Sequence, residues 1–292
     1  MVTVVQWVLD TRKLWLEASK TAELELVAAR AMDLLLDSER AAVLRYYHVR
    51  DAKLALGSAL LKRLVIAQHI AGVPWAAATP VRDARTKPVF HHPAGSEQQP
   101  VLFNVSHQAG LVVLLAAADG APAGTQLGVD VVCPGERRAR DLETVTAADD
   151  GWSQYVAMHD SVLSPAEARR LVATEGGPDR RLAHFYALWC LREAYVKMTG
   201  EALLASWLGE LEMRGFAPPG EGEDELEVFL GPAGGEKVTD VDLRIEWFLG
   251  KQYMISTAVR NPDPSVPLPL GTFELLNLET ILSKAEELKA TR

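Results

Sequence analysis

The spacing of apolar and polar residues in the first part of the chain predicts helices mixed with strands. From Ser38 to Ala71 apolar residues recur with a helical period and Gly72-Val73-Pro74 follows as a stop signal, so one long helix with a kink at Gly57 is expected. The polar stretch from Pro80 to Pro100 is typical of a loop. Strands are predicted at residues 1–10, 101–105 and 111–117, with a hairpin-like turn over residues 106–110.

The rest of the chain carries the same mixture of patterns. Ser164-Pro165-Ala166-Glu167 is a capping box with proline at the first helical position, which predicts a helix that continues through Ala173. A second helix is expected over residues 182–200, where Gly200 stops it. Residues 133–151 are expected to form a long loop or an irregular helix. The other expected elements are strands at 126–132, 226–230, 243–249 and 253–259, and a closing helix at 275–290.

The order of these elements predicts the fold class. Helices and strands do not alternate in a strict βαβ rhythm, which favours α+β over a doubly wound sheet. A chain of 292 residues suits two lobes. The small, turn-forming residues from Ala118 to Gly124 mark the boundary, so an N-terminal lobe over residues 1–123 and a C-terminal lobe over residues 124–292 are predicted.

Composition indicates a globular protein and argues against several other classes. The contents of 48% hydrophobic and 24% charged residues allow a sizeable core. No apolar run approaches the roughly 20 residues of a membrane helix, and nothing resembles a secretory signal, so a cytoplasmic protein without membrane association is expected. Cys133 and Cys190 lack metal-ligand spacing, which favours two reduced thiols.

Charge is unevenly distributed along the chain. The net charge is −9, yet residues 1–90 carry 13 basic against 9 acidic side chains. One segment of the predicted long helix is especially basic, with Asp51 as its acidic residue, and contains Arg40, Arg45, Arg50, Lys53, Lys62 and Arg63. This segment suits a polyphosphate or an acidic partner protein, and a solvated helix face explains it equally well. The pI near 5.3 argues against nucleic acid as a partner.

Two acidic residues are candidates for chemistry. Asp130 lies in an apolar strand, where a carboxylate is costly unless it is paired, binds a cation or faces a cleft. In the second predicted helix, Trp189, Glu193 and Lys197 share one face, since residues four apart are neighbours. Taken alone, a hydrogen-bonded structural aspartate and an ordinary stabilising Glu–Lys pair also explain these two patterns.

A polar segment upstream is a candidate phosphate site. Asn104-Val105-Ser106-His107 ends a strand and starts a turn, where backbone N–H groups and a hydroxyl can hold a phosphate. A Ser–His hydrolase site is disfavoured, because adjacent turn residues rarely reach nucleophile–base geometry and the chain has no Gly-x-Ser-x-Gly elbow there. Arg82 and Thr86-Lys87-Pro88 add cations in the preceding loop, and a plain polar turn is the alternative.

In combination and in this order, the motifs resemble those of the Sfp-type 4′-phosphopantetheinyl transferases. The resemblance covers most of residues 40–260, and its last two motifs are the family's signature pair. The motif Arg50-Asp51-Ala52-Lys53 and the segment Ser106-His107-Gln108 are most similar to those of animal and fungal members. The motifs are Arg50-Asp51-Ala52-Lys53, Thr86-Lys87-Pro88, Phe103-Asn104-Val105-Ser106-His107-Gln108, Gly128-Val129-Asp130 and Trp189-Cys190-Leu191-Arg192-Glu193-Ala194-Tyr195-Val196-Lys197.

The resemblance implies a monomer of two similar α+β lobes related by a pseudo-twofold, with coenzyme A in the cleft between them. The first lobe is expected to hold the nucleotide side and the second the metal and catalytic motifs. Asp130 and Glu193 match the positions that hold magnesium, with manganese as an alternative ion, and Lys197 matches the lysine that contacts the pyrophosphate. The residues expected to bind coenzyme A are Arg45, Arg50, Lys53, Arg82, Lys87, Ser106, His107, Arg192 and Lys197.

Three positions depart from the family pattern. Val132 stands where many bacterial relatives have a third metal-binding carboxylate, so Gln108 is expected to complete the metal shell through water. Arg192 replaces the commoner lysine, which keeps the charge but not the compact ammonium group. Thr86 replaces the usual glycine before Lys-Pro and restricts the loop's backbone.

The implied activity is magnesium-dependent transfer of the 4′-phosphopantetheine group from coenzyme A to a serine of apo carrier proteins, with release of adenosine 3′,5′-bisphosphate. Carriers of polyketide, nonribosomal peptide, fatty acid or lysine pathways are the expected acceptors, and Cys133 to Ser161 the expected docking segment. The expected catalytic residues are Asp130, Glu193 and Lys197, with Glu193 accepting the serine proton directly or through a metal-bound water.

Two other classes of function remain open. A non-catalytic module that binds coenzyme A or a carrier protein would explain the basic helix and the phosphate turn, but would have little use for the pair Asp130 and Glu193. A hydrolase that uses His107 would remain active after chelation of divalent metal.

Overall fold

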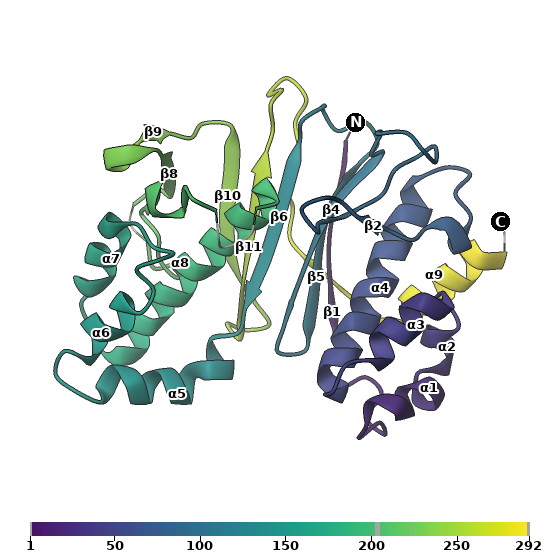
Figure 1. Ribbon diagram of the computed structural model, residues 1–292, viewed down its shortest axis with the longest axis horizontal. Coiled ribbons are helices and arrows are strands. Elements are labelled where there is room, and N and C mark those ends of the chain that lie inside the picture. The colour runs from purple at the N-terminus through teal and green to yellow at the C-terminus, as the bar shows by residue number, and fades with distance from the viewer. Residues whose placement is uncertain (1, 202–204, 223, 291–292) are drawn as a thin grey trace. The chain divides into compact units, whose positions relative to one another are not determined.

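The computed structural model describes residues 2–201, 205–222 and 224–290, and the chain divides into two compact units (Figure 1). One unit comprises Met1–Leu127 together with Pro262–Arg292, and the other comprises Gly128–Asn261. Each unit combines helices with antiparallel strand pairs, so the predicted α+β class is confirmed. Among the described helices, none has the length and apolar character needed to cross a membrane.

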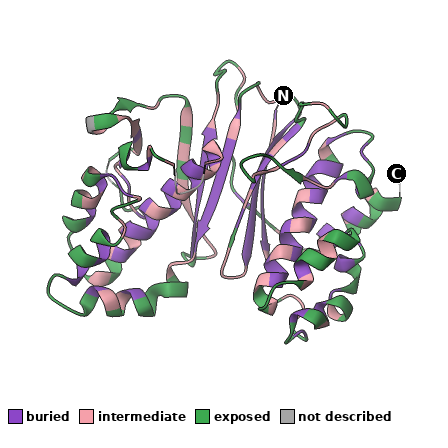
Figure 2. Cartoon of the chain, viewed as in Figure 1, coloured by how far each residue is buried: buried purple, intermediate pink, exposed green. Residues whose placement is uncertain are grey.

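The first unit is built on a sheet with the strand order β12-β1-β5-β4. Strand β5 (Leu111–Ala118) pairs antiparallel with both β1 (Thr3–Asp10) and β4 (Val101–Gln108), and its eight residues are all buried. An uninterrupted apolar run is what a strand covered on both faces requires, as its purple colour in Figure 2 shows.

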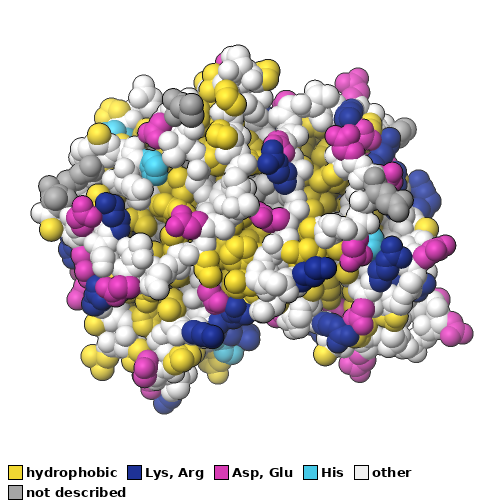
Figure 3. All heavy atoms as spheres, turned by 180° about the vertical axis from the view of Figure 1, so that it is seen from behind, with side chains coloured by type: hydrophobic (Ala, Val, Ile, Leu, Met, Phe, Trp, Pro, Cys, Tyr) yellow, Lys and Arg dark blue, Asp and Glu magenta, His cyan; other side chains and the backbone are white. Residues whose placement is uncertain are grey.

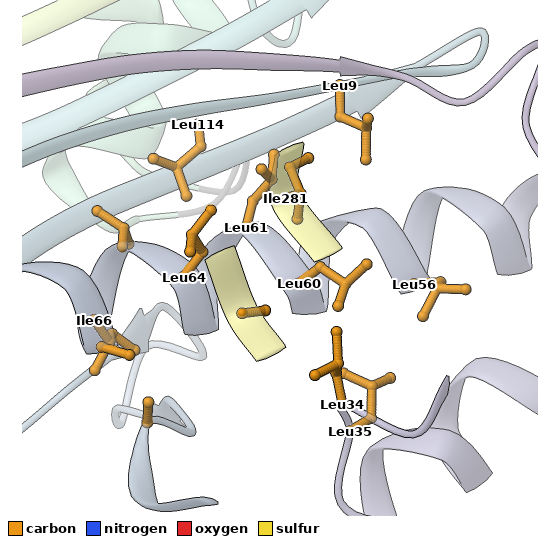
Figure 4. Packing of buried hydrophobic residues seen from close by; sticks show 14 of the residues in the cluster. Leu9, Leu34, Leu35, Leu56, Leu60, Leu61, Leu64, Ile66, Leu114 and Ile281 are labelled. Carbon is orange, nitrogen blue, oxygen red and sulfur yellow. The ribbon is translucent and has the colours of Figure 1, made fainter. Parts of the chain in front are cut away.

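Helix α4 (Val49–His69) provides most of the helical side of this core. In Figure 4, Leu61 and Leu64 lie on the side of α4 that faces the strands, whereas Leu56 and Leu60 lie on the side of Leu34 and Leu35. Gly57 allows this close packing, because a Cβ atom there would lie 3.0 Å from the Leu9 side chain. The glycine therefore serves packing inside a continuous helix.

The predicted single helix over residues 38–71 is wrong, because the segment forms two helices. Helix α3 spans Asp37–Leu44, and α4 begins only at Val49. Between them His48 adopts an extended backbone conformation, which interrupts the helical hydrogen-bond pattern. Arg45 thus lies at the end of α3, outside the long helix.

The C-terminal segment packs with the first unit, although the predicted bounds place it in the second lobe. Strand β12 (Glu274–Leu276) pairs in parallel with β1, and α9 (Leu278–Ala290) buries Ile281, Leu282 and Ala285 in the first core. These apolar side chains are removed from water only where a complementary surface is available, and α4 supplies that surface.

Two cations of the basic segment are used inside the first unit. Arg63 is fully buried and donates to the Glu39 carboxylate at 2.8 Å and to the Trp75 carbonyl at 2.6 Å. Arg40 donates to the Met32 carbonyl at 2.7 Å. These side chains stabilise the fold, so the basic pattern of this segment partly reflects internal ion pairs rather than a ligand site.

The remaining elements of the first unit are short. Residues 80–100, predicted as a loop, include a two-stranded hairpin that places Arg82 and Lys87 around its turn. The short elements are η1 (Thr21–Glu23), α1 (Leu24–Val27), α2 (Ala29–Met32), η2 (Trp75–Ala77), β2 (Val81–Arg82) and β3 (Pro88–Val89).

The second unit packs helices on a sheet with the order β10-β11-β6. Strand β10 (Val241–Phe248) pairs antiparallel with β11 (Tyr253–Arg260), and α8 (Pro178–Thr199) lies against them. Strand β6 spans Gln126–Val132. The other elements are α5 (Pro134–Thr146), α6 (Gly151–Ala157), α7 (Pro165–Val172), η3 (Leu208–Glu210), β7 (Leu211–Arg214), β8 (Glu227–Leu230), η4 (Pro232–Gly234) and β9 (Glu236–Lys237).

Local signals in this half of the chain set the helix ends as predicted. The Ser164 hydroxyl accepts from the Glu167 N–H at 3.2 Å, and the Glu167 carboxylate accepts from the Ser164 N–H at 2.9 Å, so the capping box is confirmed. Helix α8 ends at Gly200, whose φ of 76° favours glycine. Residues 134–146, for which a loop or an irregular helix was expected, form the regular helix α5.

Candidate active site

Strand β6 and helix α8 approach each other so closely that only glycine fits between them. A Cβ atom on Gly128 would lie 2.0 Å from the Ala194 carbonyl oxygen and 2.5 Å from the Met198 nitrogen. Backbone atoms on both sides leave no side chain free to move aside. Gly128 therefore sets the distance between β6 and α8, and with it the position of Asp130 two residues further along β6.

Asp130 forms an ion pair across this contact. Its Oδ1 atom accepts from Lys197 Nζ at 2.6 Å, and the aspartate residue is only 6% exposed while the lysine is partly exposed. A buried carboxylate needs such a partner, because its loss of hydration is otherwise uncompensated. The cation that pairs with Asp130 thus comes from helix α8.

Glu193 lies one turn before Lys197 on the same helix and is half-buried. Burial raises the pKa of its carboxyl group, the negative charge of Asp130 raises it further, and Lys197 opposes both effects. The two carboxylates and the lysine therefore share one electrostatic neighbourhood. A carboxylate with a raised pKa is a better proton acceptor near neutral pH than an ordinary glutamate.

Cys190 lies behind this group. Its thiol donates to the carbonyl oxygens of Asp130 and Met254, each at 3.6 Å, and the residue is fully buried. Burial raises the pKa of the thiol well above its usual value, so it stays protonated. Cys190 thereby links α8 to the backbones of β6 and β11 and takes no part in thiolate chemistry.

Arg192 occupies a different environment from the one expected for a coenzyme A ligand. Its side chain is 2% exposed and donates to the Glu167 carboxylate at 2.6 Å, to the Leu208 carbonyl at 2.6 Å and to the Leu211 carbonyl at 2.9 Å. These contacts direct the guanidinium into the interior of the second unit. Arg192 thereby ties α8 to α7 and β7.

The donor set around Asp130 and Glu193 suits a hard divalent ion. Two carboxylates with water as the remaining ligands are a common way of holding magnesium. The side chain of Val132 is apolar and buried in the second core, so it supplies no further ligand. The described residues contain no cluster of three or more His, Cys, Asp and Glu side chains able to hold a metal. An ion here would depend on substrate oxygens and water as well as on this pair.

Ser106, His107 and Gln108 lie on strand β4, and the prediction that they form the turn is wrong. The turn consists of Ala109 and Gly110, both with positive φ, while Ser106 and His107 are in register with Val113 and Val112 of β5. Side chains alternate along a strand, so Ser106 is buried and His107 is exposed. They do not face each other, which further weakens the hydrolase alternative.

The hairpin of β2 and β3 holds the two cations predicted to contact the nucleotide. Lys87 Nζ donates to the Leu127 carbonyl at 3.0 Å, and burial lowers the pKa of this lysine to about 8. The exposed Arg82 donates to the Thr86 carbonyl at 2.6 Å. Thr86 adopts a φ of 66°, a strained conformation for a β-branched residue where glycine is usual.

The remaining predicted cations lie around the start of α4. Arg45 and Arg50 are exposed, and the Arg50 side chain is 76% exposed with Asp51 at 3.7 Å. Lys53 is mostly covered, and burial lowers its pKa. This end of the first unit thus presents two solvent-facing guanidinium groups and one partly desolvated ammonium group.

The structure therefore brings Asp130, Glu193 and Lys197 together in the second unit, whereas the other predicted ligands, apart from Arg192, belong to the first unit. Sequence reasoning missed the packing role of Gly128 and the partnership of Glu167 with Arg192. Glu167 was recognised in the capping box, and its complete burial is the feature that only the fold reveals.

Two family models match the sequence. The model described as "4'-phosphopantetheinyl transferase, N-terminal" matches residues 23–119, and that of the "4'-phosphopantetheinyl transferase superfamily" matches residues 126–253. The two matched ranges contain all of the motifs named in the sequence analysis. The chain belongs to the 4′-phosphopantetheinyl transferase superfamily.

Similar proteins occur in several fungi. The chain is 53% identical to "4'-phosphopantetheinyl transferase 1" of Fusarium mangiferae, over 98% of this chain and 96% of the relative. It is 32% identical to "4'-phosphopantetheinyl transferase NpgA" of Emericella nidulans, over 88% and 82% of the two chains. It is 28% identical to the "L-aminoadipate-semialdehyde dehydrogenase-phosphopantetheinyl transferase" of Schizosaccharomyces pombe, over 68% and 69%.

Replacing Gly128 tests whether the close contact between β6 and α8 is needed. Gly128→Ala is expected to lower the free energy of unfolding by about 2–3 kcal/mol, because the new methyl group would overlap backbone atoms of α8. Gly135→Ala is the matched control, since a Cβ atom there has no neighbour within 4 Å. Urea unfolding measures both, and equal midpoints for the two variants would contradict the packing argument.

Proposed function

We propose that this protein transfers 4′-phosphopantetheine from coenzyme A to a serine of apo carrier proteins and releases adenosine 3′,5′-bisphosphate. The observation that carries the proposal is the grouping of Asp130, Glu193 and Lys197 where β6 meets α8, in a chain of this superfamily. A module that only binds coenzyme A would gain nothing from two neighbouring carboxylates, which repel the anionic ligand.

In the proposed reaction, the serine oxygen forms a bond to the phosphorus of the pantetheine phosphate. The bond from that phosphorus to the oxygen of adenosine 3′,5′-bisphosphate breaks, and the serine proton moves to a carboxylate oxygen of Glu193. Its raised pKa suits this role. Lys197 Nζ stabilises the negative charge on the pyrophosphate oxygens.

Asp130 and Glu193 would hold a magnesium ion, or manganese in its place, which when bound neutralises charge on the pyrophosphate. The proposed role of Gln108 is to hold a water of the ion's shell. Lys197 pairs with Asp130 in the protein itself. In the proposed reaction its ammonium group contacts the substrate phosphate.

The proposed binding residues for coenzyme A come from both units. We assign its phosphates and nucleotide end to Arg45, Arg50, Lys53, Arg82, Lys87, Ser106 and His107, in addition to Lys197. Arg192 is better explained as a positioning residue, because its guanidinium is bonded to Glu167 and to two carbonyls and orients the turn of α8 that carries Glu193.

The finer organisation also belongs to this proposal. We propose a cytoplasmic monomer whose two lobes are related by a pseudo-twofold, with nucleotide contacts in the N-terminal lobe and metal contacts in the C-terminal lobe. The name of the Schizosaccharomyces pombe relative supports a carrier of lysine synthesis as one acceptor, beside polyketide, nonribosomal peptide and fatty acid carriers.

The segment from Cys133 to Ser161 is the proposed carrier contact. It contains helix α5, where Arg137 and Arg140 are exposed, and an exposed Met158 after α6. Carrier domains usually present an acidic surface, so these side chains offer the complementary charge and one apolar contact.

The central experiment is the intact mass of an apo carrier protein after incubation with this protein, coenzyme A and magnesium. We expect a gain of about 340 Da, which follows from the chemical formula of the phosphopantetheine group, and we expect chelation of the metal to abolish it. Glu193→Gln is expected to slow the transfer by about 10²–10⁴-fold, because it removes the proton acceptor.

Glu246→Gln is the matched control for that variant. Burial raises the pKa of Glu246 as well, but Glu246 lies on β10 and is not part of the proposed site. It is expected to retain wild-type transfer. Full activity of Glu193→Gln would remove Glu193 from the mechanism. Binding of coenzyme A with no mass gain on any carrier type would favour the binding module, and transfer that survives chelation would exclude the metal.

The lowered pKa of Lys87 predicts a pH dependence for binding of adenosine 3′,5′-bisphosphate. Lys87 is charged below about pH 8 and loses its proton above it, while a bound phosphate favours the charged form. The dissociation constant is therefore expected to rise by up to about tenfold between pH 7 and pH 9. Calorimetry on Lys87→Arg, which stays charged, should show this rise abolished; an unchanged slope in that variant would exclude Lys87 from the site.

A further inference from the structure

A second cavity, apart from the proposed reaction site, lies entirely within the second unit. Its volume is about 530 Å³, which is in the range of small-molecule sites. It opens between the start of α7, strand β7 and the turn η4, and the residues that line it do not include Asp130, Glu193 or Lys197. The lining residues used below are Arg169, Arg170, Glu210, Glu212, Arg214 and Gly234.

Two of these arginines are held in fixed positions by one buried carboxylate. Glu212 is 5% exposed and accepts from Arg170 Nη2 at 2.5 Å and from Arg214 Nε at 2.9 Å. Arg170 also donates to the Met213 carbonyl at 3.3 Å. The guanidinium carbon of Arg214 lies 3.7 Å from the ring centroid of Phe229. Both groups are therefore oriented before any ligand arrives.

These guanidinium groups still have donors available to a ligand. The side chains of Arg170 and Arg214 are 39% and 40% exposed, and each guanidinium has five N–H groups, of which the contacts above use only some. Arg169 is exposed, and no ion-pair partner for it is found in the described part of the chain. Three cations thus border one cavity.

Gly234 keeps this side of the cavity open. A Cβ atom there would lie 3.3 Å from Arg214 Nη2 and 3.4 Å from Glu212 Oε2, and the φ of Gly234 is 94°. A larger residue would crowd the outer edge of the Arg214 guanidinium. The glycine therefore leaves this donor edge accessible.

The charge in the cavity is positive in a protein with a net charge of −9. Arg169, Arg170 and Arg214 outnumber the carboxylates of Glu212 and Glu210. Planar guanidinium groups favour phosphate and carboxylate oxygens in paired hydrogen bonds. A phosphate monoester, with a charge of about −1.5 to −2 and three acceptor oxygens, can bond several guanidinium groups at once, whereas a single carboxylate offers two oxygens.

We propose that this cavity is a second anion site that binds a small organic molecule through a phosphate monoester group. The phosphate lies against Arg169, Arg170 and Arg214, and the volume beyond it accommodates the organic part of the ligand. Free phosphate and a phosphorylated side chain of a partner protein share the same chemistry, and the experiment separates these sources.

The test is calorimetric titration of the full chain with phenyl phosphate at low ionic strength, beside inorganic phosphate and a phosphoserine hexapeptide. Arg169→Gln and Arg170→Gln are expected to weaken phenyl phosphate binding at least tenfold. Arg244→Gln is the matched control, because Arg244 is an exposed arginine of the same unit that pairs with Asp242 outside the cavity. Thermal unfolding of each variant verifies the fold. If Arg170→Gln is unstable, Arg169→Gln decides, because Arg169 is exposed and forms no ion pair with the residues that the structure describes.

The proposal predicts one phenyl phosphate per chain, bound more tightly than inorganic phosphate or the phosphopeptide. No binding to the wild-type protein, or equal binding to Arg169→Gln and Arg244→Gln, would overturn the site. A phosphopeptide that binds tenfold more tightly than phenyl phosphate would overturn the assignment to a small molecule, and equal affinity for inorganic phosphate would remove the role of the organic part.

Discussion

The backbone contact between β6 and α8 at Gly128 is the constraint on which the candidate active site depends. It leaves no room for a side chain, and it sets Asp130 of the strand opposite the turn of the helix that carries Glu193 and Lys197. Without this contact, Asp130 on β6 and Glu193 on α8 would lie too far apart to act together. The motif Gly-x-Asp therefore has a steric part and a chemical part.

The charges gathered at this contact are unfavourable until they are compensated. Burial raises the pKa of Glu193, and the negative charge of Asp130 raises it further. Lys197 compensates Asp130 only in part. A site that concentrates negative charge in this way is poorly suited to stabilise the fold and well suited to bind a cation together with an anionic substrate.

A different ion pair fixes another side of α8. Arg192 and Glu167 are both almost fully buried, and the Glu167 carboxylate also accepts from the backbone N–H groups of Ser164 and Met213. Buried pairs of this kind contribute little net stability because of their desolvation, but they hold elements in one arrangement. The helix is thus held in place through Arg192, while Glu193 and Lys197 stay partly exposed. Acidic and basic side chains are interspersed over the face drawn in Figure 3, which offers no continuous basic surface there.

Local signals in the sequence predicted the local structure well. The capping box at Ser164, the stop at Gly200 and the strands of both hairpins are decided by neighbouring residues and by alternation of apolar side chains. The proximity of Asp130 to α8 could be predicted only through the family resemblance, because the two segments are about sixty residues apart. Features that depend on the whole fold were missed. The break at His48 interrupts a continuous apolar pattern, the C-terminal segment returns to pair with β1, and Arg192 turns inward to a glutamate 25 residues away.

The most direct test of the account is whether Asp130 and Glu193 act as one cation site. Manganese binding can be measured by electron paramagnetic resonance in the presence of coenzyme A, for the wild-type protein, Asp130→Asn, Glu193→Gln and the double variant. The account predicts that each single change weakens binding at least tenfold and that the double variant binds little more weakly than either single one, because the ligands are coupled. Manganese affinity that is unchanged in both single variants would contradict it.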